Sequence, residues 1–388
     1  MKKKSVAVGL AMVMMASVIF SGCGNAEKDS KKEAKDSAGK VGCILGVGGL
    51  GDQAFNDLIY EGLEKAKEEL NIDFDYAEPT QVSEFELMMR DMASSGEYGA
   101  IICVGFDQTD ALSKVAPEFP DQQFAFIDGT LEAENVVNYA AKEEEGAFLA
   151  GALAGLMKKD AAAYGVEDND TIGFIAALET PILLKWNSGY MAGAQDVNPK
   201  INCLSDFVAG DNPFGDTTTA KEIAISQKNQ GADIIFHAAG GAGLGVFDKS
   251  DAAQSETIKT KLTVTAPDGS QKVFDAAKEY DFYAIGCNSN QNTVNPEHIV
   301  ASILKRVDTA SYDIAKSAII DKDLAVGTTV SLGLSDEGMD YTLEESKVPV
   351  SEEDIQILDE IKQKIVDGEI KVPSTIEDAK KFVKENQY

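Results

Sequence analysis

The sequence predicts an α/β protein built from two doubly wound parallel-sheet lobes. Short, continuous apolar runs alternate with amphipathic segments along most of the chain. Such runs are typical of parallel strands that helices cover on both faces. The alternation occurs in two successive series, and 388 residues are enough for two lobes.

The first series begins at about residue 40. Strands are predicted at "VGCILGV", "IDFDYA", "AIICVGF", "QFAFID" and "VVNYA". Between the first two strands, apolar residues from Phe55 to Leu70 recur at the spacing of one helical face. The segment "AKEEEGAFLAGALAGLMKK" then predicts a long helix that leads into the second series.

The second series predicts strands at "TIGFIAA", "INCLSDFVAG", "ADIIFHAAG" and "DFYAIGC". Residues 258–275 differ, because they alternate with a period of two around Pro267-Asp268-Gly269. This pattern predicts a β-hairpin inserted into the second lobe. Near the C-terminus, Ser351 followed by acidic residues predicts the start of a final helix.

The N-terminus indicates export and lipidation. Residues 1–22 combine three lysines with a short apolar core and read as a signal peptide. Small residues precede Cys23, as in a bacterial lipobox, so Cys23 is the expected lipid attachment site. The alternative is an ordinary signal peptide with an incidental cysteine. Residues 23–39 hold no large apolar side chain and predict a flexible tether. We therefore expect a lipid-anchored protein on the extracytoplasmic face of the cell membrane.

Composition argues against several functions. The net charge is −30, which disfavours nucleic acid as a partner. The sequence has two histidines and no C-x-x-C pair, so it predicts neither a metal site nor a disulfide framework. No G-x-S-x-G elbow accompanies the histidines. We expect no cofactor, no metal and no catalytic residue.

Gly46, Gly48 and Gly51 form a G-x-G-x-x-G pattern after the first strand. One interpretation is a dinucleotide site, and the other is a tight strand-to-helix turn. The polar pair Asp52-Gln53 follows the glycines, so the helix should begin near Phe55 rather than among them. An exported protein also seldom meets nicotinamide cofactors. The turn is therefore favoured.

Polar residues follow several of the predicted strands. These strand ends hold amides, glycines and a lone carboxylate, with Asp128, Gly241 and Asn288 among them. Ligands of open α/β folds bind at the carboxyl ends of strands. This set of residues suits hydrogen bonding to a neutral polar ligand better than bond cleavage.

Several ordered motifs resemble the basic membrane protein family, from about Lys40 to the C-terminus. They are "GGLGDQAFNDLIYEGLEKA", "FAFIDG", "EEGAFLAGALAG", "GADIIFHAAGGAGLGVF", "YAIGCNSNQ", "ASILKRVD" and "KIVDGEIKVP". Members of this family are lipid-anchored substrate-binding proteins of ABC importers, and purine nucleoside receptors are among them. The resemblance implies a type I periplasmic-binding fold, a small-molecule ligand between the lobes, and ABC permease and ATPase partners. With it, we divide the chain into one lobe of 40–139 plus 289–323 and another of 140–288 plus 324–388.

The resemblance also implies roles for individual residues. Phe55 and Phe236 match two aromatics that stack on the base, and Asn56 matches the polar residue beside the first. Asp128 matches an acidic residue that binds the sugar, and Lys305 matches a basic residue that binds the ligand.

Gly241 matches an amide donor to the ligand, and Trp186 is a further candidate for ligand contact. Gly46 and Asn288 depart from the family pattern, because both stand where the family carries an acid. We therefore expect weaker discrimination between bases. Another aromatic heterocycle such as riboflavin is an alternative ligand, and a membrane-tethered sensor is an alternative function.

Each of these residues has a purely structural alternative. Phe55 and Phe236 could be core aromatics, and Asp128 could cap a helix. Trp186 could pack in the core or at a rim, and Lys305 could be a solvated lysine.

Overall fold

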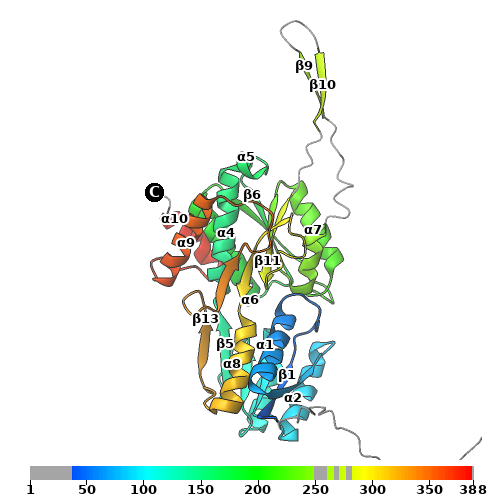
Figure 1. Cartoon of the computed structure of the whole chain (residues 1–388), viewed down its shortest axis with the longest axis vertical. Helices are drawn as coiled ribbons and strands as arrows, with labels where there is room; N and C mark the ends of the chain where they lie inside the picture. Colours follow the sequence, from blue (N-terminus) through cyan, green and yellow to red (C-terminus); the bar gives the residue numbers. More distant parts are fainter. Residues whose placement is uncertain (1–36, 249–259, 266–270, 277–281, 387–388) are drawn as a thin grey trace, which may run out of the picture. The chain divides into compact units, whose positions relative to one another are not determined.

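A computed structural model describes residues 37–248, 260–265, 271–276 and 282–386 (Figure 1). The predicted signal peptide, Cys23 and most of the predicted tether lie outside the described residues. So does the predicted turn at Pro267-Asp268-Gly269. Within the described ranges, no helix combines the length and apolar character needed to cross a membrane.

The first sheet has six strands in the order β13-β5-β4-β3-β1-β2, and all of its strand pairs are parallel. Its strands are β1 (Gly39–Ile44), β2 (Ile72–Ala77), β3 (Ala100–Val104), β4 (Phe124–Ile127), β5 (Val136–Ala141) and β13 (Thr329–Leu332). The helices that accompany it are α1 (Phe55–Leu70), α2 (Phe85–Ser95), α3 (Thr109–Val115) and α8 (Val307–Lys316). Every residue of β3 and β4 is buried, because helices cover both faces of the sheet.

The second sheet also has six strands, in the order β14-β12-β11-β8-β6-β7. Its strands are β6 (Thr171–Ala176), β7 (Asn202–Phe207), β8 (Ile234–Ala238), β11 (Tyr283–Asn288), β12 (Ile299–Lys305) and β14 (Met339–Thr342). Only the edge strand β14 runs antiparallel within this sheet. Its helices are α4 (Glu143–Lys159), α5 (Ala161–Tyr164), α6 (Pro181–Val197), α7 (Thr217–Asn229), α9 (Glu352–Val366) and α10 (Ile376–Asn386). Two parallel sheets with alternating helices confirm the predicted fold class.

The chain passes between the two sheets at three places: after β5, after β12 and after β13. Strand β12 pairs in the second sheet, whereas the predicted division gives 289–323 to the first lobe. Strand β13 pairs in the first sheet, whereas the predicted division gives 324–388 to the second. Strand β12 is apolar, and β13 is a four-residue strand with exposed Thr329 and Ser331; the residues of neither strand encode which sheet it joins.

Strands β9 (Thr260–Thr265) and β10 (Gln271–Ala276) form a separate antiparallel pair, in the region where the sequence predicts a hairpin. The helix predicted after Ser351 is present as α9, but it is not the final one, because α10 follows it. Ser351 accepts a hydrogen bond from the backbone N–H of Asp354 at 3.0 Å, which confirms the predicted start of α9.

Helix α1 begins at Phe55, as predicted, after a loop of glycines. It packs closely on α8 at Gly62, where a Cβ atom would lie 2.1 Å from the backbone oxygen of Asp308. Only glycine permits this approach. The contact joins the helix that begins at Phe55 to the helix that follows Lys305.

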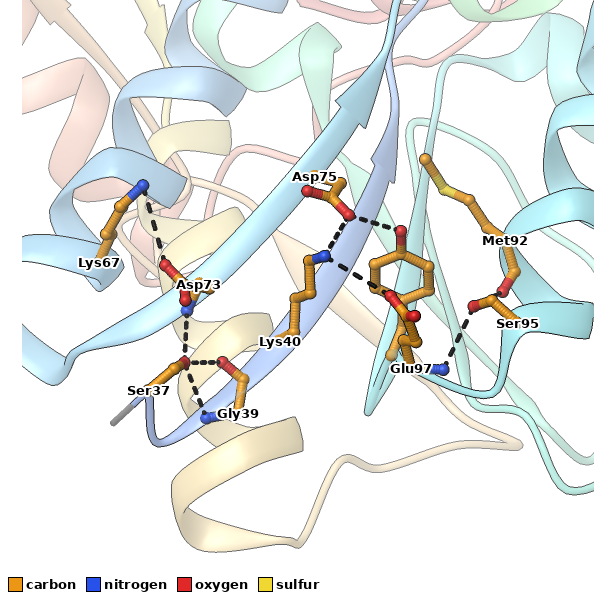
Figure 2. Close-up of polar contacts among 10 residues, drawn as sticks. Ser37, Gly39, Lys40, Lys67, Asp73, Asp75, Met92, Ser95 and Glu97 are labelled. Carbon is orange, nitrogen blue, oxygen red and sulfur yellow. Dashed lines mark hydrogen bonds and ion pairs between the residues drawn. The ribbon is translucent and has the colours of Figure 1, made fainter. Parts of the chain in front are cut away.

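Polar contacts connect neighbouring strands at the amino-terminal edge of the first sheet. The Ser37 hydroxyl donates to the Gly39 carbonyl at 2.7 Å and accepts from the Asp73 N–H at 3.3 Å. Lys40 on β1 forms an ion pair with Asp75 on β2 (Figure 2). These contacts fix where β1 begins, and therefore which residues reach its carboxyl end.

Candidate ligand-binding site

A cavity of about 280 Å³ lies where the carboxyl ends of strands from both sheets meet. The first sheet and its loops contribute Gly46, Val47, Gly48, Leu50, Gly51, Asp52, Phe55, Asn56, Gly105, Phe106, Asp107 and Asp128. The second contributes Leu183, Trp186, Phe214, Gly215, Thr217, Ala238, Gly240, Gly241, Leu244, Cys287, Asn288 and Lys305. A cavity at strand ends is the expected position for a ligand in this kind of fold.

The glycine loop is a tight turn that positions Asn56. The Asp52 carboxylate accepts hydrogen bonds from the backbone N–H groups of Ala54 and Asn56, both at 2.9 Å, and so caps the start of α1. The Asn56 side chain accepts from the Gly46 N–H at 2.9 Å and donates to Asp52 at 3.2 Å. Burial raises the pKa of Asp52, although these backbone donors oppose the shift. Asn56 is therefore held rigidly at the cavity wall.

A buried charge cluster forms the other end of the site. Lys305, at the end of β12, forms ion pairs with Asp128, after β4, and with Glu143, the first residue of α4, at 2.9 Å. Lys185 pairs with the second oxygen of Glu143 at 3.2 Å. The cluster holds two carboxylates and two ammonium groups, so its formal charges cancel. It joins residues from both sheets and would be costly to break.

The environment shifts the protonation equilibria of this cluster. Burial raises the pKa of Asp128 to about 6, although Lys305 opposes the shift. Burial would also raise the pKa of Glu143, but the charges of Lys305 and Lys185 outweigh it and hold that pKa below its usual range. Burial acts to lower the pKa of Lys305, but Asp128 and Glu143 raise it well above its usual range. The ammonium group therefore stays protonated.

Two aromatic rings lie beside this ammonium group. The Lys305 Nζ atom is 5.4 Å from the centre of the Phe55 ring and 6.0 Å from the centre of the Trp186 ring. Both distances are within the range of cation–π attraction. Phe55 is half-buried at the first turn of α1, and Trp186 on α6 is 2 % exposed. Both line the cavity.

Phe236 does not line the cavity, which corrects the expectation of a stacking role. Strand β8 continues for two residues beyond Phe236, so this side chain lies inside the sheet and not at its end. It is fully buried and packs against Phe174, Trp186 and Tyr190, with ring centres 5.2–5.8 Å apart. Besides Trp186, the aromatic that the second sheet presents to the cavity is Phe214, in the loop between β7 and α7.

Residues of the two sheets touch across the cavity mouth. The Ser289 hydroxyl and the Gln291 amide both donate to the backbone carbonyl of Gln53, Gln291 at 3.4 Å. The rings of Phe106 and Phe214 have centres 6.5 Å apart. The structure therefore has a closed arrangement of the strand ends around the cavity.

Two strand-end residues have left-handed backbone conformations. Asp128 has φ of 68° and Asn288 has φ of 69°, directly after β4 and at the end of β11. Asp and Asn tolerate this region better than other non-glycine residues. Such conformations direct a side chain away from the strand path, and here both residues line the cavity. Gly241 also lines it, and a Cβ atom there would lie 3.3 Å from the backbone oxygen of Phe214.

The sequence analysis therefore named seven residues that the structure brings together: Phe55, Asn56, Asp128, Trp186, Gly241, Asn288 and Lys305. It did not name Glu143, Asp107, Phe106 or Phe214. Phe214 and Asp107 both follow predicted strands, and that position was the signal available for them. Glu143 opens a predicted helix with two further acids, and its sequence gives no sign of a buried ion pair.

In the described part of the chain, no group of three His, Cys, Asp or Glu side chains is placed to hold a metal ion. Cys43, Cys103 and Cys287 are free and buried, as their apolar strands predict. Burial raises the pKa of the Cys287 thiol, which lines the cavity, so it stays protonated.

The fold and the site at the strand ends define the class of a solute-binding protein of ABC transporters. A solved structure of an ABC transporter solute-binding protein from Aeropyrum pernix has a TM-score of 0.73 and 26% identity, over 90% of this chain and 97% of that one. Residues 40–376 match the Bmp family model, described as ABC transporter substrate-binding protein, PnrA-like. The chain belongs to this family, which confirms the resemblance seen in the sequence motifs.

Two relatives add to this comparison. An uncharacterised lipoprotein of Pyrococcus abyssi is 31% identical over 347 residues, which is 88% of this chain and 77% of the relative. The ABC transporter nucleoside-binding protein BmpA of Lactococcus lactis is 27% identical over 380 residues, which is 96% of this chain and all of the relative.

Proposed function

We propose that this protein is a lipid-anchored, extracytoplasmic receptor that captures a nucleoside, with purine nucleosides favoured, for an ABC importer. Cys23 carries the lipid in this proposal. The loaded receptor delivers the nucleoside, chemically unchanged, to a permease driven by an ATPase subunit.

The observation that carries the proposal is that the cavity has an aromatic part and an adjacent charged part, which meet where the Lys305 Nζ atom lies 5.4 Å from the centre of the Phe55 ring. Phe55 and Phe214 come from different sheets and offer flat apolar surfaces. Stacking of a base on such a ring contributes about 1–3 kcal/mol. Asp128 can accept hydrogen bonds from ribose hydroxyls, and Lys305 can donate to them. A nucleoside has this combination of a flat heterocycle and adjacent hydroxyl groups.

The size of the cavity supports a compact ligand. Its volume of about 280 Å³ is near the lower end of the range of roughly 300–1,000 Å³ for small-molecule sites. A single heterocycle with one sugar suits this space better than a peptide. Because the lining comes from both sheets, such a ligand stabilises the closed arrangement more than any open one.

The test is native mass spectrometry of the purified full chain, followed by calorimetry with adenosine, guanosine, uridine and riboflavin. We expect one bound nucleoside per chain, recovered intact after prolonged incubation. Release of free base would make the protein an enzyme. Binding of riboflavin alone would retain the receptor and change its ligand, and binding of none of the four would contradict the proposal.

A further inference from the structure

Asp107 is an acid of the cavity wall that has no counter-charge among the described residues. It follows β3, in the short turn before α3, and lines the cavity. A Cβ atom on Gly105 would lie 2.8 Å from its Oδ1 atom, so the bare glycine makes room for this carboxylate. Gly105 has φ of 103°, which also requires glycine. The turn is therefore shaped to hold the Asp107 carboxylate over the end of β3.

The other acids around the cavity are satisfied by the protein. Asp52 accepts from three backbone N–H groups at the start of α1. Asp128 and Glu143 share the ammonium group of Lys305. Among the described residues, the only hydrogen-bond donor to the Asp107 carboxylate is its own backbone N–H. Its remaining acceptor positions are available to a ligand.

Asp107 lies between two other strand ends that line the cavity. In the order β4-β3-β1, it lies between the end of β4, which carries Asp128, and the end of β1, which carries Gly46. Gly46 offers no side chain, and its backbone N–H is already bound to Asn56. Because the proposed function assigns Asp128 and Lys305 to the sugar, Asp107 is the lining carboxylate that remains available to the edge of a bound heterocycle.

We propose that Asp107 selects the heterocycle of the ligand, by accepting hydrogen bonds from two adjacent N–H groups on its edge. This inference rests on the proposed function. A carboxylate can accept two such bonds side by side. Guanine presents this edge with its N1–H and exocyclic amino group. Hypoxanthine presents only the N1–H, and adenine presents an acceptor at N1. The expected order of affinity is guanosine, then inosine, then adenosine, in place of the weak discrimination expected from Gly46 and Asn288.

The proposal implies a pH dependence. The titratable groups that line the same cavity are Asp52, Asp128, Lys305 and the Cys287 thiol. Burial, with a further contribution from the charge of Asp128, raises the pKa of Asp107 to about 6. A protonated Asp107 would lose one acceptor position, so guanosine should bind less tightly as the pH falls from 7.5 to 5.

The test is calorimetry on the full chain in detergent, after dialysis to remove co-purified ligand, with guanosine, inosine and adenosine at pH 7.5 and 5. Hydrogen bonds to charged groups are strong enough that Asp107→Asn should weaken guanosine binding by about ten- to a hundredfold. Adenosine binding should change less than about threefold, because the Asn amide can donate to N1. The variant should also lose the part of the pH dependence that Asp107 causes. Asp110→Asn, on the exposed first turn of α3, is the matched control and should change nothing.

Stability supplies a second measurement that a merely structural role would not reproduce. The pKa of Asp107 is raised from 3.8, so its protonated form favours folding, and this contribution is lost as the pH rises through about 6. Asp107→Asn should therefore raise the melting temperature of the ligand-free protein at pH 7.5, and the gain should shrink towards pH 4.5. Equal weakening of all three nucleosides, or none, would overturn the role of Asp107 while leaving the receptor function intact. Failure of the unmodified protein to bind any nucleoside would overturn both proposals.

Discussion

Phe214 and Phe236 are two aromatic residues of the second sheet with different surroundings. Phe214 lines the cavity from a loop, and Phe236 is fully buried among three other rings. Phe214 is half-buried at the edge of the core, so loss of its ring opens a smaller hole than loss of the Phe236 ring. This pair therefore separates ligand contact from core packing.

We expect Phe214→Ala to weaken nucleoside binding by about ten- to a hundredfold, because one stacking surface is lost. The free energy of unfolding should change little. Phe236→Ala should instead reduce that free energy by about 3–5 kcal/mol, the usual cost of removing a buried ring. Calorimetry and urea unfolding of both variants provide the measurement. A stable Phe236→Ala variant with impaired binding would return Phe236 to the site.

At the scale of elements, the contact between α1 and α8 links the two parts of the site. Helix α1 carries Phe55 and Asn56, and α8 follows Lys305 after a single residue. Their backbones meet at Gly62, against Asp308. This close packing keeps the aromatic part of the cavity in register with the charged part.

Gly62→Ala should destabilise the protein by about 1–3 kcal/mol, because the added methyl group has no space and must push the helices apart. On helix propensity alone the same change would stabilise by about 1 kcal/mol. Glu61→Ala, at the exposed neighbouring position, is the control and should cause little change. Urea unfolding measures both. Increased stability of Gly62→Ala would show that the helices are not in close contact.

At the scale of the whole molecule, the proposed function places one receptor domain next to the membrane. The domain belongs to a family of ABC transporter substrate-binding proteins, and a relative is named a lipoprotein. The proposed anchor, Cys23, is separated from β1 by about 15 residues of charged and small side chains. Such a tether would let the domain close on its ligand away from the lipid surface.

Cys23→Ser should release the protein from the membrane fraction into the medium, because no other lipid attachment is proposed. Cys203→Ser, at a half-buried position on β7, is the matched control and should stay with the membranes. Fractionation of cells that express each variant, followed by immunoblotting, is the measurement. Membrane retention of the Cys23 variant would contradict lipid anchoring.

Local patterns in the sequence were sufficient to predict the class of fold, most strands and the starts of α1 and α9. These features depend on local information: apolar periodicity, glycines before a helix, and a serine followed by acids. The position after parallel strands also indicated Asp128, Gly241 and Asn288 as residues of the cavity wall, because such residues gather at one edge of a sheet. The family motifs supplied the rest of that prediction.

Three further points depend on the tertiary structure and not on local sequence patterns. It placed β12 and β13 in their sheets, which depends on pairing between residues far apart in the chain. It showed that Phe214 lines the cavity and that Phe236 does not, because β8 continues beyond Phe236 and buries this side chain inside the sheet. Among the described residues, Asp107 has no counter-charge, whereas Asp52, Asp128 and Glu143 are satisfied by the protein. Whether a carboxylate is paired depends on which groups the fold brings within a few ångströms of it, and no local pattern in the sequence encodes that distance.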